Sequence, residues 1–549
     1  MADSAAPPPP SPDGRGAVET AAPHPPPFAT FHARRGMVCS VDHLASGAGI
    51  SVLRAGGNAV DAAVATSAVL AVTTQHMCGM GGDLFALVHH TDGEPPSCLN
   101  ASGRAGSGAD AEALRSEGHR RMPTDGDVRA VTVPGCVDGW LALLERHGRL
   151  PIAEVFEPAR SYAEEGFPAS PQLAAAISVI AGIDGADDYP AATRRGDVIT
   201  RPGVARTLAA IAEGGRAAFY EGEFGAGLLR VGAGLFDADD LARSQADWVA
   251  PLGAPVWGHQ VFTIPPNSQG YLALAAARIA EMIGIGPDGA ATPPDDAWVH
   301  ALVEAARLAG YDRLAVLHDR ADGDALVGHD RLAERAARFD PDHRVGVTAP
   351  RGDGDTIYMC TADGDGMAVS LIQSNARGWG AYLTVPEVGI FLHNRGQGFS
   401  LEPGHPAEFA PGRRPPHTLA PALVQRDDGT LRAVLGTMGG DTQPQVVQQM
   451  LTRLLAHGQS PATIITAPRW RLGDGGFSTW EDDGPDEVRI EGNAPPSWRT
   501  GLERRGHSVV VDPVLDTGYG HAHMIERSPE GTLGGAHDPR ALTGGTATW

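Results

Sequence analysis

The chain has 549 residues, of which 42% are hydrophobic and 20% charged, a composition typical of a folded globular protein. Its formal net charge is −23, so the average surface repels a phosphate backbone, and nucleic acid is excluded as an expected partner. Five cysteines without a CxxC spacing disfavour both a disulfide framework and a zinc site.

The N-terminal segment is rich in proline. The first 27 residues hold nine prolines and no apolar segment of the kind that a secretory signal carries. We therefore expect residues 1–28 to be a disordered lead-in. The longest apolar stretch, 59–72, is 14 residues long and includes Asp61, which is short of the roughly 20 residues needed to span a bilayer. The sequence predicts a soluble, cytoplasmic protein with no membrane partner.

Helical patterns dominate the first part of the folded chain. Residues 44–72 predict two helices separated at Gly56-Gly57, with Asn58 as the N-cap of the second and Asp61 at its third position. The second helix is apolar nearly all round, so we expect it to be buried. Residues from about 151 to 340 are rich in Ala, Leu and Arg at helical spacing and predict mainly helices.

Short strand-like runs follow a glycine-rich turn at 78–82 and become frequent after residue 340. Two of them, IYMCTA and MAVSLIQS, flank the turn DGDG and predict a β-hairpin. Helix resumes at about Gln443, and the end of the chain returns to short strands. The pattern predicts layered helices and sheets with a junction near residue 355.

The junction lies in GDGDTIYMCTADGDG, where Thr356 follows Asp355 and begins a strand-like run. One interpretation is an ordinary turn followed by a good strand residue. The other is that Thr356 cleaves the peptide bond before it and becomes an amino terminus. That residue would then supply a hydroxyl nucleophile and an α-amine, whose reference pKa of about 7.7 to 8.0 suits a general base.

Eight stretches place this junction in a wider pattern. They are GMVCSVDHLASGAGISVLRAGGNAVDAAVA (36–65), CGMGGDLFALV (78–88), VPGCVDGW (133–140), IPPNSQGYLAL (264–274), DTIYMCTADGDGMAVSLIQSN (355–375), VGIFLHNRGQGFS (388–400), RRPPHTLAPALV (413–424) and GTMGGDTQPQ (436–445). In this order they resemble the gamma-glutamyltransferase family of N-terminal nucleophile hydrolases. The resemblance implies an α+β fold, a four-layer αββα sandwich. It also implies a proenzyme that cleaves itself between Asp355 and Thr356 into a helix-rich large subunit, 29–355, and a small subunit, 356–549, which stay associated.

The resemblance implies catalytic roles for four residues. Thr356 takes the nucleophile position, and Ser374 takes that of a second hydroxyl which hydrogen-bonds to it, although Ser374 also fits a plain strand end. Gly439 and Gly440 match the glycines whose N–H groups form the oxyanion hole, and backbone without side chains can approach an oxyanion closely. An ordinary Gly-Gly turn is the alternative. No metal or cofactor is implied.

The substrate-binding positions depart from the best-known family pattern. Where that pattern has an Arg for the α-carboxylate of a γ-glutamyl group, this chain has Ser102, with Arg104 two positions on. Where it has an Asp for the α-amine, this chain has Gly398. His417 and Thr418 stand in the place of two serines that bind the carboxylate.

Four residues are therefore candidates for binding the substrate: Arg104, Arg395, His417 and Thr418. Arg104 lies nearest to the lost arginine in the sequence, and Arg395 is another source of a cation, although a surface role is usual for such a residue. His417 fits a binding role and a structural role equally well.

The leading hypothesis is an enzyme that cleaves or transfers γ-glutamyl or related amide acyl groups through an ester on Thr356, with water or an amine as the acceptor. A second hypothesis keeps this mechanism but assigns another small amide, such as oxamate. A third, of a different class, is an inactive relative or binding protein that never matures. Denaturing electrophoresis separates the third hypothesis from the others, because maturation yields two fragments.

Overall fold

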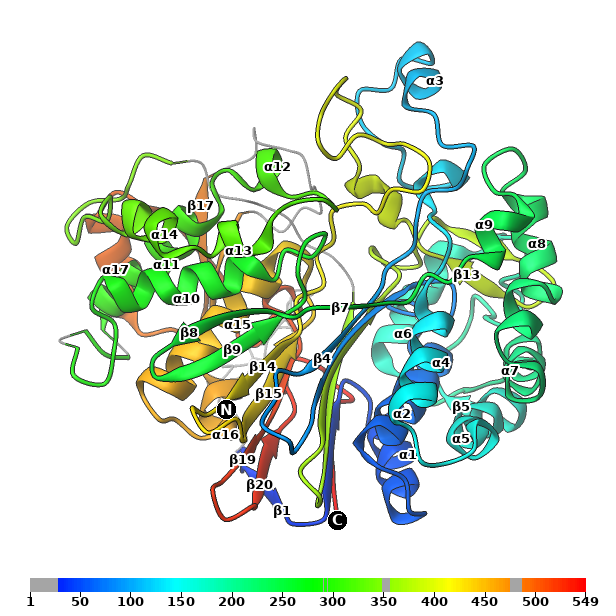
Figure 1. Cartoon of the computed structure of the whole chain (residues 1–549), viewed down its shortest axis with the longest axis horizontal. Helices are drawn as coiled ribbons and strands as arrows, with labels where there is room; N and C mark the ends of the chain where they lie inside the picture. The colour runs from blue at the N-terminus through cyan, green and yellow to red at the C-terminus, as the bar shows by residue number, and fades with distance from the viewer. Residues whose placement is uncertain (1–27, 290, 294, 348–355, 474–485) are drawn as a thin grey trace, which may run out of the picture.

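The computed structural model describes residues 28–289, 291–293, 295–347, 356–473 and 486–549. The lead-in at 1–27 and Asp355 lie outside the described residues. Two seven-stranded antiparallel sheets pack face to face at the centre, with helices on both outer sides (Figure 1). This confirms the expected αββα sandwich.

The two sheets draw strands from both ends of the chain. The first sheet consists, in spatial order, of β1 (Phe31–Ala33), β20 (Leu533–Ala536), β19 (Ala522–Arg527), β15 (Leu431–Thr437), β14 (Ala422–Gln425), β9 (His259–Thr263) and β8 (Leu252–Val256). The second consists of β21 (Gly545–Thr548), β2 (Gly36–Ser40), β10 (Ile357–Asp363), β11 (Ala368–Ser374), β3 (Asp83–His89), β4 (Ser97–Ala101) and β7 (Asp247–Val249). The central hairpin β10–β11 confirms the pairing of IYMCTA with MAVSLIQS.

Smaller sheets lie outside this pair. They are β5 (Phe167–Pro168) with β6 (Val198–Ile199), β12 (Leu383–Val385) with β13 (Ile390–Leu392), and β16 (Trp470–Leu472) with β17 (Glu487–Glu491) and β18 (Ser508–Asp512). In the last of these, β17 and β18 run parallel, whereas the other pairs are antiparallel.

The helices form the outer layers. On the side of the second sheet are α1 (His43–Arg54), α2 (Ala59–Thr73), α3 (Ala111–Ser116), α4 (Cys136–His147), α5 (Ile152–Glu165), α6 (Pro171–Ala176), α7 (Pro202–Tyr220), α8 (Glu223–Val231) and α9 (Ala238–Ala242). On the side of the first sheet are α10 (Tyr271–Met282), α11 (Asp296–Gly310), α12 (Arg313–Val316), α13 (Gly323–Leu326), α14 (His329–Ala336), α15 (Gln443–Leu451), α16 (Pro461–Thr466) and α17 (Pro496–Arg504). In Figure 1, α3 projects at the top of the molecule.

Apolar side chains fill the space between the two sheets. This central cluster includes Met37, Phe85, Tyr358, Ile372, Leu423, Val434 and Ile525. Helix α2 covers the opposite face of the hairpin, so every residue of β10 and β11 is buried. Burial on both faces also explains why β3 is buried throughout, although its sequence reads as an alternating strand.

The first two helices follow the prediction closely. Helix α1 ends at Arg54 and α2 begins at Ala59, after the Gly56-Gly57 break. The Asn58 side chain accepts hydrogen bonds from the N–H groups of Val60 and Asp61, and the Asp61 carboxylate accepts from the Asn58 N–H. This reciprocal capping box fixes where α2 starts, and all of α2 is buried as predicted.

The segment from 151 to 340 is mainly helical as predicted, but it also contains strands. Strands β7, β8 and β9 occupy 247–263; β7 and β8 are edge strands of the two central sheets, and β9 lies next to β8. Strands β8 and β9 form a local hairpin whose turn is Trp257-Gly258, and this turn was not recognised in the sequence. The partners of β7 and of the other side of β9 are distant, since β7 pairs with β4 and β9 with β14, and such pairings leave little local signal.

No helix in the described part of the chain is long and apolar enough to cross a membrane. All five cysteines are buried and free. Cys39 and Cys360 are register partners on the adjacent strands β2 and β10, so they belong to the packing between the sheets.

Candidate active site

Thr356 directly precedes the first strand of the central hairpin. Its side chain is buried, and the register that pairs Ile357 with Gln373 sets Thr356 opposite Ser374 at the open end of the hairpin. The hydroxyl oxygens of Thr356 and Ser374 are 2.9 Å apart. The hydrogen bond expected between the nucleophile and a second hydroxyl is therefore present.

Either hydroxyl of this pair can be the donor. The Ser374 oxygen accepts a hydrogen bond from the N–H of Ala376 at 2.8 Å, and its own hydroxyl proton can be donated to Thr356. A donor at this place holds the Thr356 hydroxyl in one orientation and stabilises the negative charge that develops on Oγ1 as a base removes its proton.

The turn after β15 carries Gly439 and Gly440 with positive φ angles of 124° and 53°. Glycine adopts these angles without the steric cost that a Cβ brings. Neither N–H donates a hydrogen bond to a described residue, and helix α15 begins at Gln443 with its positive end toward this turn. Two available N–H groups beside a helix start are suited to hold an oxyanion.

Packing between the sheets brings this turn toward Thr356. Gly436 lies against the ring of Tyr358, because a Cβ at Gly436 would be 2.4 Å from Tyr358 Cε2. One residue earlier, the carbonyl of Leu435 accepts from Ser370, which lies further along the hairpin. The end of β15 therefore runs toward the Thr356 end of the hairpin, and the glycine turn follows it.

A buried aspartate lies next to Ser374 in the sheet. Asp83, at the start of β3, is the register partner of Ser374. Its carboxylate is 3.0 Å from His417 Nε2 and 3.4 Å from His393 Nδ1, and it accepts from the N–H of Gly103 at 2.8 Å. Burial raises the pKa of Asp83, but the two histidines and this N–H outweigh it, so the net shift is downward and Asp83 is an anion.

His417 is a neutral histidine with both ring nitrogens engaged. Burial and the nearby Arg395 lower its pKa to about 3, against the opposing effect of Asp83. Nε2 donates to Asp83 and Nδ1 accepts from the N–H of Leu419 at 3.3 Å. Of the two roles considered for His417, this geometry favours the structural one, and direct substrate contact stays a prediction.

Arg395 is a buried cation beside the site. It lies after β13 on a short helical turn, is 1% exposed, and donates to Thr418 Oγ1 at 3.1 Å. Burial lowers its pKa to about 10, and Asp83 and Asp441 act against this shift, so Arg395 is charged at neutral pH. Asp441 directly follows the glycine turn and accepts from Arg313 at 2.8 Å. Arg395 and Thr418, two of the predicted binding residues, are thus in contact.

Arg104 and Gly398, near and at the lost clamp positions, both make structural contacts. The guanidinium of Arg104 is bound to Asp247 and Gln245, so its contacts do not favour a substrate-binding role, which stays a prediction. A Cβ at Gly398 would lie 2.6 Å from the carbonyl oxygen of Pro416. An acid at position 398 would therefore require the backbone to move.

Sequence reasoning missed several residues of this site. Asp83 and Asp441 lie inside the quoted stretches CGMGGDLFALV and GTMGGDTQPQ, where a charged residue beside glycines was the available signal. Asn375 follows Ser374, and its buried Oδ1 has no hydrogen-bond partner among the described residues, while its Nδ2 donates to the carbonyl of Gln75. This Oδ1 faces the glycine-rich segment before β3, since a Cβ at Gly82 would lie 2.9 Å from it.

The sandwich, the hydroxyl at the head of its central strand and the opposed glycine turn define the N-terminal nucleophile hydrolase class. The family model of gamma-glutamyltranspeptidase matches residues 45–548, and the chain belongs to this family. It is accordingly an enzyme of the hydrolase and acyltransferase type.

Individual relatives carry different substrate names. The chain is 36% identical to the glutathione hydrolase-like YwrD proenzyme of Bacillus subtilis (92% of this chain, 97% of the relative). It is 35% identical to the oxamate amidohydrolase proenzyme of Klebsiella pneumoniae, with the same coverage of 92% and 97%. Among solved structures, cephalosporin acylase from Bacillus halodurans superposes with a TM-score of 0.86 at 33% identity, covering 96% of this chain and 98% of that one.

Proposed function

We propose that this chain cleaves itself between Asp355 and Thr356 and then hydrolyses, or transfers to an amine, the acyl group of a small amide. The observation that carries the proposal is the hydrogen bond of 2.9 Å between Thr356 and Ser374 at the head of β10. A nucleophile that is the first residue of a chain needs no separate base, because its own α-amine lies on the same residue. The names of the proenzyme relatives agree with this reading.

The proposed reaction assigns one role to each of these groups. The α-amine of Thr356 takes the hydroxyl proton, and Oγ1 attacks the amide carbon to form a tetrahedral intermediate. The N–H groups of Gly439 and Gly440 hold its oxyanion. The intermediate collapses by breaking the C–N bond, the amine leaves with the proton, and an ester remains on Thr356. Water or an amine then attacks the ester. The acyl group leaves as an acid or as a new amide, and Oγ1 of Thr356 regains its proton.

The acyl group is proposed to carry a carboxylate. Arg395 is a buried cation and Thr418 a buried hydroxyl in contact with it, a pair that suits an anion. A γ-glutamyl group also carries an ammonium, for which position 398 offers no acid because it is a glycine. A small anionic amide such as oxamate, which has a carboxylate and no ammonium, is the second candidate.

A panel of amides tests the acyl specificity. Purified mature protein is assayed on γ-glutamyl and glutaryl amides and on oxamate, in the parent and in Arg395→Lys, Arg104→Lys and His417→Ala. Lysine keeps the charge but cannot form two parallel hydrogen bonds with a carboxylate. We expect Arg395→Lys to lose tenfold or more in kcat/KM on carboxylate-bearing substrates, about 1.4 kcal/mol, with self-cleavage intact. Equal activity of all variants on every substrate would contradict this assignment.

A further inference from the structure

A buried glutamine lies between the two parts of the proposed site. Gln269 belongs to the stretch IPPNSQGYLAL, which runs from the end of β9 into α10. Its side chain is fully buried, and Nε2 donates to the carbonyl oxygens of Thr418 and Gly440, both at 2.9 Å. One amide group therefore contacts the loop at 417–420, which carries the proposed carboxylate ligand Thr418, and the glycine turn at 439–440.

The chemistry of the partners fixes the orientation of this amide. Both are carbonyl oxygens, which only accept hydrogen bonds, so the NH₂ end of the Gln269 side chain must face them. The opposite atom, Oε1, has no hydrogen-bond partner among the described residues. Within the described structure the side chain thus bonds only to the loop and the turn, and neither an ionised carboxylate nor an apolar group of the same size can make these bonds.

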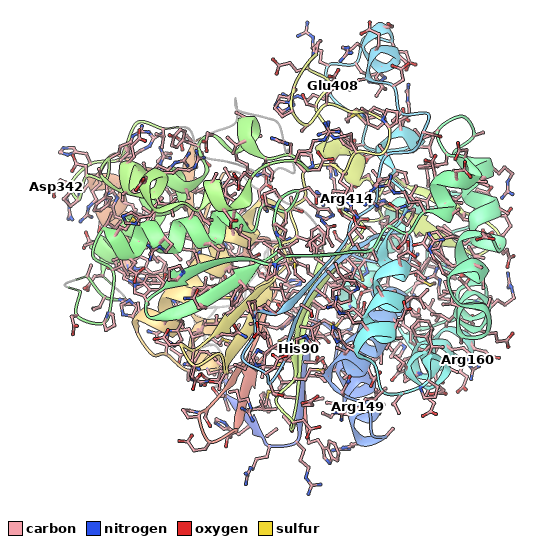
Figure 2. All side chains as sticks on the ribbon, viewed as in Figure 1. His90, Arg149, Arg160, Asp342, Glu408 and Arg414 are labelled. Atoms are coloured by element: carbon pink, nitrogen blue, oxygen red, sulfur yellow. The ribbon has the colours of Figure 1, made fainter. Side chains whose placement is uncertain are left out.

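The backbone of Gln269 is attached to the same loop. Its N–H donates to the carbonyl of His417 at 2.9 Å, and the N–H of His417 donates to the carbonyl of Asn267 at 2.8 Å. The loop follows Arg414, which Figure 2 labels between the two helical layers. Because main-chain hydrogen bonds hold residue 269 on the loop side, its side chain is the part that reaches across to the glycine turn.

The other contacts of the turn set the size of the expected effect. The carbonyl of Gly440 also accepts from the N–H of Gln443 at the start of α15, and Oε1 of Gln443 accepts from the N–H of Ala420 at 3.0 Å. The loop and the turn therefore stay in contact when the Gln269 amide is lost, and Gly440 is misplaced rather than released. Full loss of an oxyanion donor costs about 10²- to 10³-fold in kcat, so we expect a smaller loss here.

We infer that Gln269 is a positioning residue, which through one amide orients Gly440 for the oxyanion and Thr418 for the acyl carboxylate. The inference rests on the proposed function, in which Gly440 holds the oxyanion and Thr418 pairs with Arg395 on the carboxylate. Gln269 acts only through these residues. It makes the binding of the acyl group and the stabilisation of the transition state depend on the same side chain.

Gln269→Met tests this, because methionine keeps the length and bulk of the side chain but donates no hydrogen bond. The substrates are the best carboxylate-bearing amide of the panel and its carboxamide analogue, such as oxamate and oxamide. We expect kcat to fall roughly five- to twentyfold on both, because the oxyanion forms with either, while KM rises about threefold or more only with the carboxylate. Gln269→Glu, which places a carboxylate against two carbonyl oxygens, should lose at least as much.

The matched control is Gln448→Met. Gln448 is also fully buried and donates from Nε2 to a carbonyl, that of Leu302 at 3.2 Å, but it lies on α15 against α11. This variant should keep the kcat and KM of the parent. The inference is overturned if Gln269→Met keeps both constants, if only one of them changes on the carboxylate-bearing substrate, or if Gln448→Met changes them equally.

Crystal structures decide the inference without turnover. If the parent hydrolyses no amide of the panel, the proposed function fails, and the structures of Gln269→Met and Gln448→Met are compared with that of the parent. The same comparison applies if Gln269→Met does not mature. A displacement of both Gly440 and Thr418 in the Gln269 variant alone supports the inference, and an unchanged turn or an unchanged loop overturns it.

Discussion

At the scale of single residues, the site depends on short contacts between buried polar groups. Thr356 and Ser374 are 18 positions apart and meet because the hairpin register places them opposite each other. The sequence could predict this pair, since both residues lie in one hairpin with a recognisable turn. The sequence could not predict the hydrogen bond between His417 and Asp83, because 334 positions separate these residues and only the packed fold brings them together.

Ser374→Ala should slow both self-cleavage and turnover. The variant loses one buried hydrogen bond to the nucleophile, worth about 1 to 1.5 kcal/mol, so kcat should fall roughly tenfold with little change in KM. Ser370→Ala is the matched control, because Ser370 lies on the same strand but hydrogen-bonds to Tyr358 at 2.9 Å instead. Equal loss in both variants would mean that the strand, and not the contact with Thr356, is responsible.

The pH dependence of turnover should follow the α-amine of Thr356. Only the neutral amine can accept the hydroxyl proton, so kcat/KM should rise with pH through a pKa near the reference of about 7.7 to 8.0. His417, with its pKa lowered to about 3 by burial, stays neutral and should add no inflection above pH 5. A profile that is flat from pH 6 to 9, with chemistry limiting the rate, would argue against the amine as the base.

At the scale of elements, the sequence predicted those helix boundaries that are set by contacts between residues close together in the chain. The Gly-Gly break, the Asn58 cap and the uniformly apolar α2 were readable because capping and burial patterns lie within a few residues. Strand β7 was missed because its partner β4 is distant in the sequence, whereas β8 and β9 were missed because the local turn at Trp257-Gly258 was not recognised.

Helix α11 carries a buried ion pair that anchors the chain ahead of the junction. Arg307 Nε is 3.0 Å from Glu304 Oε1, and Arg307 also donates to the carbonyls of Val345 and Val347. Arg307→Met should destabilise the protein by about 3 to 5 kcal/mol in denaturant unfolding, because it leaves Glu304 buried without its cation. The double change Glu304→Gln/Arg307→Met should recover part of this loss; a double variant less stable than Arg307→Met would contradict the account.

At the scale of the whole molecule, many histidines are buried in the neutral form. Burial is the largest cause that lowers the pKa of His76, His417 and His507 to about 3 and of His300 and His521 to about 4. Below their reference pKa of about 6.5, the unfolded chain binds protons that the folded chain does not. Stability should therefore be full above about pH 6.5 and fall steadily toward pH 4. Calorimetric Tm values that stay constant from pH 7 to 5 would contradict this.

The account as a whole depends on Thr356 becoming an amino terminus, and the mass of the purified polypeptides measures this directly. We expect the parent to yield two chains, residues up to 355 and residues 356–549, and Thr356→Ala to yield one chain of the full 57.1 kDa. Thr356→Ser should still yield two, because serine keeps the attacking hydroxyl. A parent that remains a single chain, or a Thr356→Ala variant that still separates into two, would contradict the claim.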